Sequence, residues 1–79
     1  MNDELFNEIA DWLNANVCHK NVVTRWDEIQ LNIAHAVGDV AKFSEIVFGL
    51  ANTARIDAAK MEELRGIFAR HVQTEEECQ

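Results

Sequence analysis

The sequence predicts an all-α fold, a small helical bundle in the order short helix, long central helix, short helix. The chain has no proline and only three glycines, while hydrophobic residues make up 48% of its 79 positions. A small β-sandwich or barrel needs many turns, and the residues that form turns are scarce here. The apolar residues instead recur at the three- and four-residue steps of amphipathic helices. This length fits a single domain, predicted over residues 1–73 and followed by a frayed acidic tail over 74–79.

The first predicted helix covers residues 2–17. Asn2 or Asp3 can cap its N-terminus, and its acidic first turn suits the positive end of the helix dipole. Trp12 lies on its apolar stripe and is expected to anchor the core. The stripe has a helical spacing and consists of Leu5, Phe6, Ile9, Trp12, Leu13 and Val17. Residues 18–21 have low helical preference and are expected to form a connection.

One apolar pattern runs through the middle of the chain and predicts a single long helix over residues 25–53. Thr24 and Asp27 give it a start that resembles a capping box. Gly38, followed by an aspartate, could end one helix and start another, but the register continues across it. We therefore expect one helix, bent at most at Gly38, with Trp26 as a second core anchor. The nine positions of this stripe are Trp26, Ile29, Ile33, Ala36, Val40, Phe43, Val47, Leu50 and Ala54.

The third predicted helix starts near Asp57, which is a good N-cap residue. Arg65 and Arg70 lie towards its C-terminal end, where the helix dipole favours cations. Its apolar stripe consists of Met61, Leu64, Ile67, Phe68 and Val72. A short helix on each side of a long one predicts a bundle that folds back on itself.

Two short helices can cover only part of a central helix that spans roughly 45 Å. Some apolar and small residues off the main stripe therefore stay uncovered, and the small ones would admit a close neighbouring helix. The predicted dimer interface consists of Leu31, Ala34, Gly38, Ala41 and Phe48. A homodimer is the simplest way to bury these residues. The alternative is that the helix breaks at Gly38 and a compact four-helix monomer covers everything.

The net charge of −7 is concentrated at the two ends of the chain. Residues 1–16 contain no base, and residues 75–77 are three consecutive glutamates, while the charges between these segments cancel. No basic patch is visible, which argues against direct contact with nucleic acid. We expect the acidic first helix either to aid solubility or to meet a basic partner protein. The predicted partner-binding surface consists of Asp3, Glu4, Glu8 and Asp11.

The sequence offers little catalytic chemistry, and we expect neither an enzyme nor a bound metal or cofactor. Cys18 and His19 are adjacent metal-ligand types, but adjacent residues seldom bind one metal ion well. The glycines are too scattered for a phosphate-binding loop. The sequence shows no secretory signal and no apolar run long enough for a membrane span. We therefore expect a cytoplasmic protein in which Cys18 and Cys78 are free thiols.

Two resemblances fall in the middle of the chain. Residues 31–41 resemble the second helix of MazG-type nucleotide pyrophosphohydrolases, acidic all-helical oligomers in which paired acidic motifs hold magnesium. The matching positions here are Ala36 and Asp39, so one carboxylate of the pair is missing. Residues 33–38 are similar to the first helix and turn glycine of a helix-turn-helix. In the recognition helix that this resemblance implies, only Lys42 could contact a phosphate.

The sequence thus predicts a non-enzymatic protein-interaction module. We expect a small inhibitor or adaptor, of the kind that phages and mobile elements encode, which binds a basic, nucleic-acid-handling protein. Two alternatives remain open. One is a DNA-binding regulator that uses the helix-turn-helix-like segment, and the other is a degenerate MazG-like hydrolase without a complete metal site.

Overall fold

The chain folds into α-helices that pack around a central pair. The computed structural model describes the backbone of residues 3–77 and the side chains of residues 3–71. Within that range the helices are α1 (Asp3–Asn16), α2 (Arg25–Val37), α3 (Val40–Thr53) and α4 (Ala58–Glu77). One turn of 3-10 helix, η1 (Cys18–Lys20), follows α1. The predicted all-α class is confirmed.

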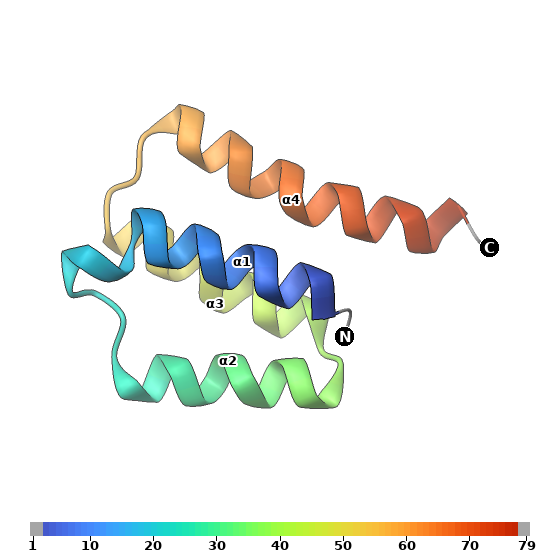
Figure 1. Cartoon of the computed structure of the whole chain (residues 1–79), viewed down its shortest axis with the longest axis horizontal. Coiled ribbons are helices and arrows are strands. Elements are labelled where there is room, and N and C mark those ends of the chain that lie inside the picture. Colours follow the sequence, from blue (N-terminus) through green and yellow to red (C-terminus); the bar gives the residue numbers. More distant parts are fainter. Residues whose placement is uncertain (1–2, 78–79) are drawn as a thin grey trace.

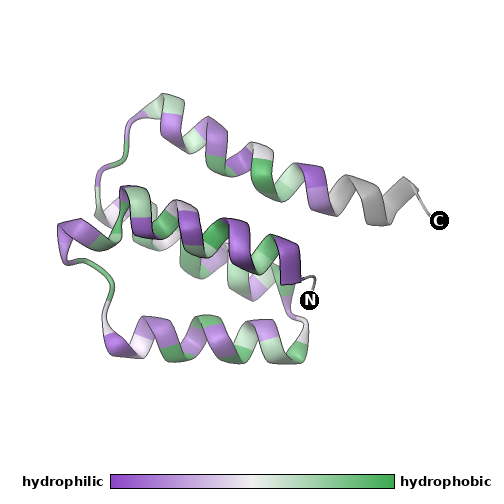
Figure 2. Ribbon diagram, viewed as in Figure 1, coloured by the Kyte–Doolittle hydropathy of each residue, from purple (hydrophilic) through white to green (hydrophobic). Residues whose placement is uncertain are grey.

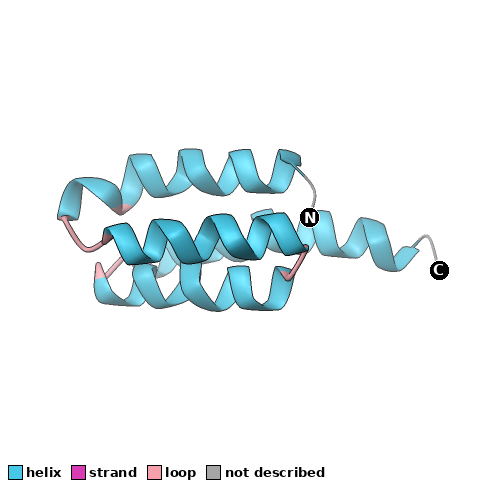
Figure 3. Ribbon diagram, turned by 90° about the horizontal axis from the view of Figure 1, so that it is seen from below, coloured by secondary structure: helices cyan, strands magenta, loops and turns pink. Residues whose placement is uncertain are grey.

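The helices are arranged in three layers. In Figure 1, α1 and α3 occupy the middle of the molecule, α2 lies on one side of them and α4 on the other. Helices α2 and α3 run antiparallel and are joined by a short connection. Figure 3 looks directly onto α2, with α1 and α3 behind it on either side. None of the other described helices covers the outer side of α2 in this view.

The core is centred on Phe43 of α3, which is only 1% exposed. The ring centroid of Phe43 lies 5.8 Å from that of Phe6 in α1 and 6.2 Å from that of Phe68 in α4. All four helices contribute buried hydrophobic side chains, and no polar or charged residue within 3–71 is fully buried. Burial of apolar surface is therefore the main term that stabilises the fold.

The predicted long central helix is wrong, because the chain breaks at Gly38 into α2 and α3. Gly38 adopts a left-handed conformation with φ 76°, and its N–H donates to the carbonyl of His35. The N–H of Asp39 donates to the carbonyl of Ala34 at 2.9 Å. This pattern is a Schellman motif, which needs a residue with positive φ and is usually built on glycine.

Asp39 then starts the next helix. Its carboxylate accepts a hydrogen bond from the backbone N–H of Lys42 at 3.0 Å, which caps α3. Both new helix ends are thus satisfied within a two-residue connection, so the break leaves few orphan backbone groups. The sequence carries both a continuous apolar register across Gly38 and a local Gly-Asp signal for a break, and the structure follows the local signal.

The break divides the nine-position apolar stripe between two environments. In α3 the members Phe43, Val47 and Leu50 are buried. In α2 the members of the same stripe face away from the core, and α2 buries Leu31 and Ala34 instead. Because the chain reverses direction at the turn, the two helices do not present the same stripe to the core.

The predicted starts of α2 and α4 are confirmed. The Thr24 hydroxyl accepts from the N–H of Asp27 while the Asp27 carboxylate accepts from the N–H of Thr24, a complete capping box. Asp57 caps α4, since its carboxylate accepts from the N–H of Lys60 at 2.9 Å. The side chain of Lys20 in η1 donates to the carbonyl of Ala54 at the end of α3.

The backbone of α4 continues through Glu77, beyond the predicted start of the tail at residue 74. The side chains of residues 72–77, and all of residues 78–79, lie outside the part of the chain that the structure describes. Of the tail predicted over residues 74–79, residues 74–77 continue the helical backbone of α4, and the predicted free thiol of Cys78 lies outside the described residues.

Two glycine substitutions of opposite expected sign test the turn between α2 and α3. Gly38→Ala should lower the free energy of unfolding by about 1 kcal/mol, because a β-carbon is strained at positive φ. Gly66→Ala should raise it by about 0.5–1 kcal/mol, because alanine is the better helix former. Gly66 lies within α4 with nothing within 4 Å of an added β-carbon. Urea denaturation of both variants measures the two effects, and a Gly38→Ala chain as stable as the parent would contradict the strained turn.

Candidate functional site

The acidic surface predicted on α1 is partly engaged within the chain. Asp3 lies 3.1 Å from Nε2 of His35 in α2. Glu8 contacts Arg70 and His71 of α4. Asp3 and Glu8 therefore hold α1 to its neighbours in the fold, and this surface is less available than the sequence suggests.

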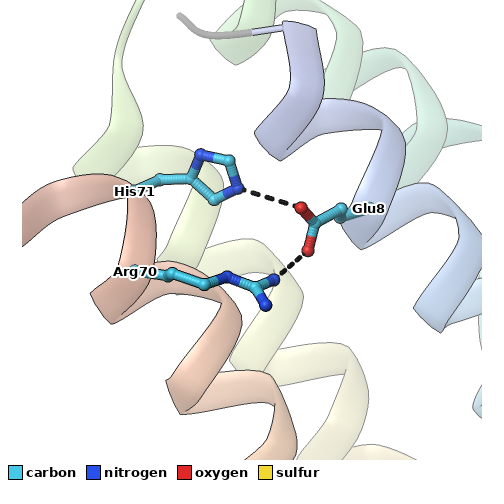
Figure 4. A network of polar contacts seen from close by, with 3 residues as sticks. All are labelled: Glu8, Arg70 and His71. Carbon is cyan, nitrogen blue, oxygen red and sulfur yellow. Dashed lines mark hydrogen bonds and ion pairs between the residues drawn. The ribbon is translucent and has the colours of Figure 1, made fainter. Parts of the chain in front are cut away.

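The contact at Glu8 connects α1 to the last described side chains of α4. One carboxylate oxygen of Glu8 pairs with the guanidinium of Arg70, and the other lies 3.2 Å from Nε2 of His71 (Figure 4). His71 is mostly covered, whereas the Arg70 side chain is 64% exposed. An ion pair this exposed contributes at most about 1 kcal/mol. The network therefore helps to position α4 and offers no enclosed site for chemistry.

Two charge reversals on α1 distinguish a stabilising contact of Glu8 from the general effect of changing a surface charge. Glu8→Lys should lower the free energy of unfolding by about 1 kcal/mol, because it replaces an attraction to Arg70 with a repulsion. Asp11→Lys, an exposed position on the same helix, should change it by less than about 0.5 kcal/mol. Thermal unfolding at low salt measures both. Equal effects of the two variants would show that the Glu8 contact does not form.

The predicted dimer-interface residues fall in several different environments. Leu31 and Ala34 are buried within the chain, against the core. Gly38 forms the turn, Ala41 is exposed on α3, and Phe48 is half-buried beside Phe68. These residues do not form one exposed surface.

A different surface stands out, on the outer side of α2. Of the large hydrophobic side chains within residues 3–71, the four that are exposed all lie on this helix. They are Trp26 at 66%, Ile29 at 41%, Ile33 at 51% and Val37 at 71% exposed. We call this row the α2 outer face. Trp26 is thus not the core anchor that the sequence analysis expected.

The spacing of the α2 outer face places its side chains in one row. Steps of three and four residues return to the same side of a helix, so the four side chains are neighbours along it. Single exposed hydrophobic residues are common on proteins, whereas the largest contiguous apolar patch of a protein is often a functional surface. Figure 2 shows hydrophobic (green) segments recurring along α2 although it is a peripheral helix. The sequence signal was present, since three of these residues belong to the predicted stripe.

Helix α2 presents this row on a rigid backbone. Its N-terminus is held by the capping box of Thr24 and Asp27, and its C-terminus by the turn at Gly38. On its inner side, the ring of His35 stacks on Phe6 of α1 with centroids 4.1 Å apart. A helix fixed at both ends and along one side needs little ordering on binding, which favours association.

Two buried nitrogens within the described side chains have no hydrogen-bond partner, Nε1 of Trp12 and Nδ1 of His35. Burying an N–H without a partner costs free energy, so such atoms are uncommon in a folded core. The unpaired Nε1 of Trp12 lowers the stability of the fold, so replacing Trp12 by phenylalanine, an aromatic ring without this N–H, should be tolerated.

A small cavity of about 220 Å³ lies between α1, α2 and α3. Its lining includes Phe6, Leu13 and Leu31, together with the thiol-bearing Cys18. Cavities that hold small molecules are mostly larger, about 300–1,000 Å³, and carry a few converging polar groups. This cavity is mainly apolar, and Cys18 in it is a half-buried free thiol.

The remaining candidate chemistry of the sequence is dispersed in the fold. Within the described side chains, no three His, Cys, Asp or Glu residues gather closely enough to hold a metal ion. Asp39, the carboxylate that the MazG resemblance retains, caps α3 through Lys42. The antiparallel course of α2 and α3 in Figure 1 differs from the crossing of about 90–120° in a helix-turn-helix.

No helix among the described residues has the length and hydropathy that a membrane span requires. The exposed large hydrophobic side chains within residues 3–71 all belong to the α2 outer face, so it is the most prominent apolar surface that the described fold leaves uncovered. Comparison of the chain with known protein families, curated proteins and solved structures finds no match.

Proposed function

We propose that this protein is a non-enzymatic interaction module and that the α2 outer face is its contact surface. The observation that carries the proposal is the row of exposed apolar side chains on a capped, rigid helix. In water such a row is unfavourable, and covering it with another chain recovers the free energy of burial. The proposal therefore assigns the binding energy to α2.

The acidic charge of the chain has a supporting role in this proposal. A net charge of −7 favours encounter with a basic protein and disfavours encounter with nucleic acid. Glu4 and Asp11 lie exposed on α1 and can contribute to such steering. A role as a small inhibitor or adaptor of a basic, nucleic-acid-handling protein is part of the proposal, supported by size and charge.

Site-specific photo-crosslinking in cells tests the proposed contact surface. A benzophenone amino acid is placed at residue 33 on the α2 outer face, or at residue 69 as a control. Ala69 is exposed on α4, in the layer on the far side of the molecule. Irradiation should give a discrete crosslinked product from residue 33 and none from residue 69, because only residue 33 is covered by another chain.

The mass of the product then identifies what covers α2. A product of twice the 9.0 kDa chain is a second copy, and any other mass is a different protein. If residue 33 gives no product, or residue 69 gives the same product, the α2 outer face is not the contact surface and the proposed function fails.

A further inference from the structure

The residue order, charge and size of the α2 outer face indicate which chain covers it. We infer that the occupant is a second copy of this chain, packed antiparallel along α2 around a two-fold axis. This inference rests on the proposed function, since it names the partner that the same surface contacts. The resulting interface is different from the one predicted from the sequence.

The α2 outer face is nearly symmetric about its own centre. Ile29 and Ile33 are two residues before and after Leu31 in the sequence. Trp26 and Val37 lie five residues before and six residues after that point. An antiparallel pair centred there places Ile29 opposite the partner's Ile33, and Trp26 opposite the partner's Val37.

This arrangement is self-complementary in size. At each end a large indole meets a small valine, and in the middle two side chains of equal size meet. A two-fold interface uses the same patch on both subunits, so the patch must complement itself in this way. A parallel pair would instead set two copies of Trp26 against each other and leave two copies of Val37 facing across a gap.

Charge also favours the antiparallel pair. Between Glu28 and Asp39, α2 carries no ionisable side chain except His35, which faces α1. The antiparallel register brings the exposed Arg25 beside the partner's Asp39 and beside the carbonyl end of the partner's α2. A guanidinium is attracted both by a carboxylate and by the negative end of a helix dipole. The two-fold axis makes this contact twice.

The acidic excess of each chain is kept away from such an interface. The excess lies on residues 1–16 and 75–77. Helix α4 is in the layer farthest from α2 (Figure 1), and α1 lies behind α2 in Figure 3. Two chains of charge −7 can therefore approach through α2 with less repulsion than through α1 or the end of α4.

The area of the surface is sufficient for a weak but specific dimer. The four exposed side chains leave on the order of 400 Å² of apolar surface in water on each copy. Pairing two copies removes about twice this area, and flanking residues such as Ala36 and Arg25 bring the total near the lower limit of about 1,200 Å² for specific interfaces. We therefore expect dissociation constants in the micromolar range.

Sedimentation equilibrium of the purified full chain tests the second copy. At about 100 µM the parent chain should sediment as a dimer, near twice 9.0 kDa, and should dissociate on dilution. Ile33→Asp should raise the dissociation constant at least about 30-fold, because it places a charge in the centre of the interface. Ala69→Asp adds the same charge on α4 and should leave the dimer unchanged. Because Ile33 is exposed, circular dichroism of Ile33→Asp should match that of the parent chain.

Pairwise crosslinking tests the orientation. In a chain with Cys18 and Cys78 replaced by serine, Trp26→Cys and Val37→Cys are prepared separately and treated with a short bis-maleimide, because these two positions lie about 16 Å apart along the helix. The mixture of the two variants should crosslink efficiently, and each variant alone should crosslink poorly. Efficient crosslinking within each separate variant would indicate a parallel pair and overturn the antiparallel arrangement.

The outcomes for the two proposals can be told apart. A parent chain that sediments at 9.0 kDa up to about 100 µM, or an Ile33→Asp chain that still dimerises, overturns the second copy. If the chain is monomeric in this way and residue 33 photo-crosslinks to a different protein in cells, the proposed function stands and only the inference of a second copy fails.

Discussion

Phe43→Ala is expected to remove most of the stability of the fold. Phe43 is 1% exposed and contacts the rings of Phe6 and Phe68, so its removal leaves a cavity between three helices. Truncations of this kind cost about 3–5 kcal/mol. A domain of 79 residues has a total free energy of unfolding of only about 4–12 kcal/mol. Chemical denaturation followed by circular dichroism measures the loss.

The control for this prediction is Phe43→Leu, which keeps most of the volume and the apolar character. We expect it to cost about 1–1.5 kcal/mol, much less than alanine. If alanine costs no more than leucine, the core is not centred on Phe43 and the three-layer packing described for this chain is wrong.

The two tryptophans should respond in opposite ways to removal. Trp12 is 4% exposed, so Trp12→Ala should lower the free energy of unfolding of the monomer by about 3–5 kcal/mol. Trp26 is 66% exposed, so Trp26→Ala should change it by less than about 0.5 kcal/mol at concentrations where the chain is monomeric. Urea denaturation at nanomolar concentration, followed by the fluorescence of the remaining tryptophan, measures both variants.

For self-association we expect the opposite order, with the larger effect from Trp26→Ala. Trp26→Ala removes the largest side chain of the α2 outer face and should weaken self-association, because aromatic residues are frequent among the residues that dominate binding energy. A Trp26→Ala chain that loses several kcal/mol as a monomer would show that Trp26 is buried in the core. In that case the outer face of α2 would not be available for binding.

Much of the fold was predictable because local signals decide where helices begin and end. The start of α2 follows from the capping box of Thr24 and Asp27, and the start of α4 follows from Asp57. The left-handed conformation of Arg55 at the end of α3 had no sequence signal, since glycine is the usual residue there. Helix ends that use preferred capping residues can be predicted, and ends that use unfavourable residues cannot.

The turn at Gly38 differs from the prediction because two signals in the sequence conflict. A regular apolar register indicates which side of a helix is apolar, but it does not indicate that one helix carries the whole register. Two antiparallel helices can carry the same register if one of them leaves its stripe exposed. Helix α2 does so, and it can bury Leu31 and Ala34 against the core at the same time. Only the tertiary arrangement distinguishes the two cases.

The sequence predicts which positions of the candidate surface are apolar, but not that they face away from the core. The prediction that the chain leaves apolar residues uncovered agrees with the described structure, but the residues are different. Periodicity identified Trp26, Ile29 and Ile33 as apolar positions and assigned them to the core. The direction in which they face depends on how α2 sits on α1 and α3, which one sequence pattern does not contain.

The fluorescence of Trp26 tests most directly whether the α2 outer face is covered by another chain. In a Trp12→Phe chain, Trp26 is the only indole, and this substitution also removes the buried Nε1 of Trp12 that lacks a partner. We predict that at about 100 µM its emission is shifted to the blue and protected from acrylamide, and that both effects disappear on dilution to the nanomolar range. Emission from a fully accessible indole at every concentration, and in the presence of the protein crosslinked at residue 33, would contradict the assignment of α2 as the contact surface.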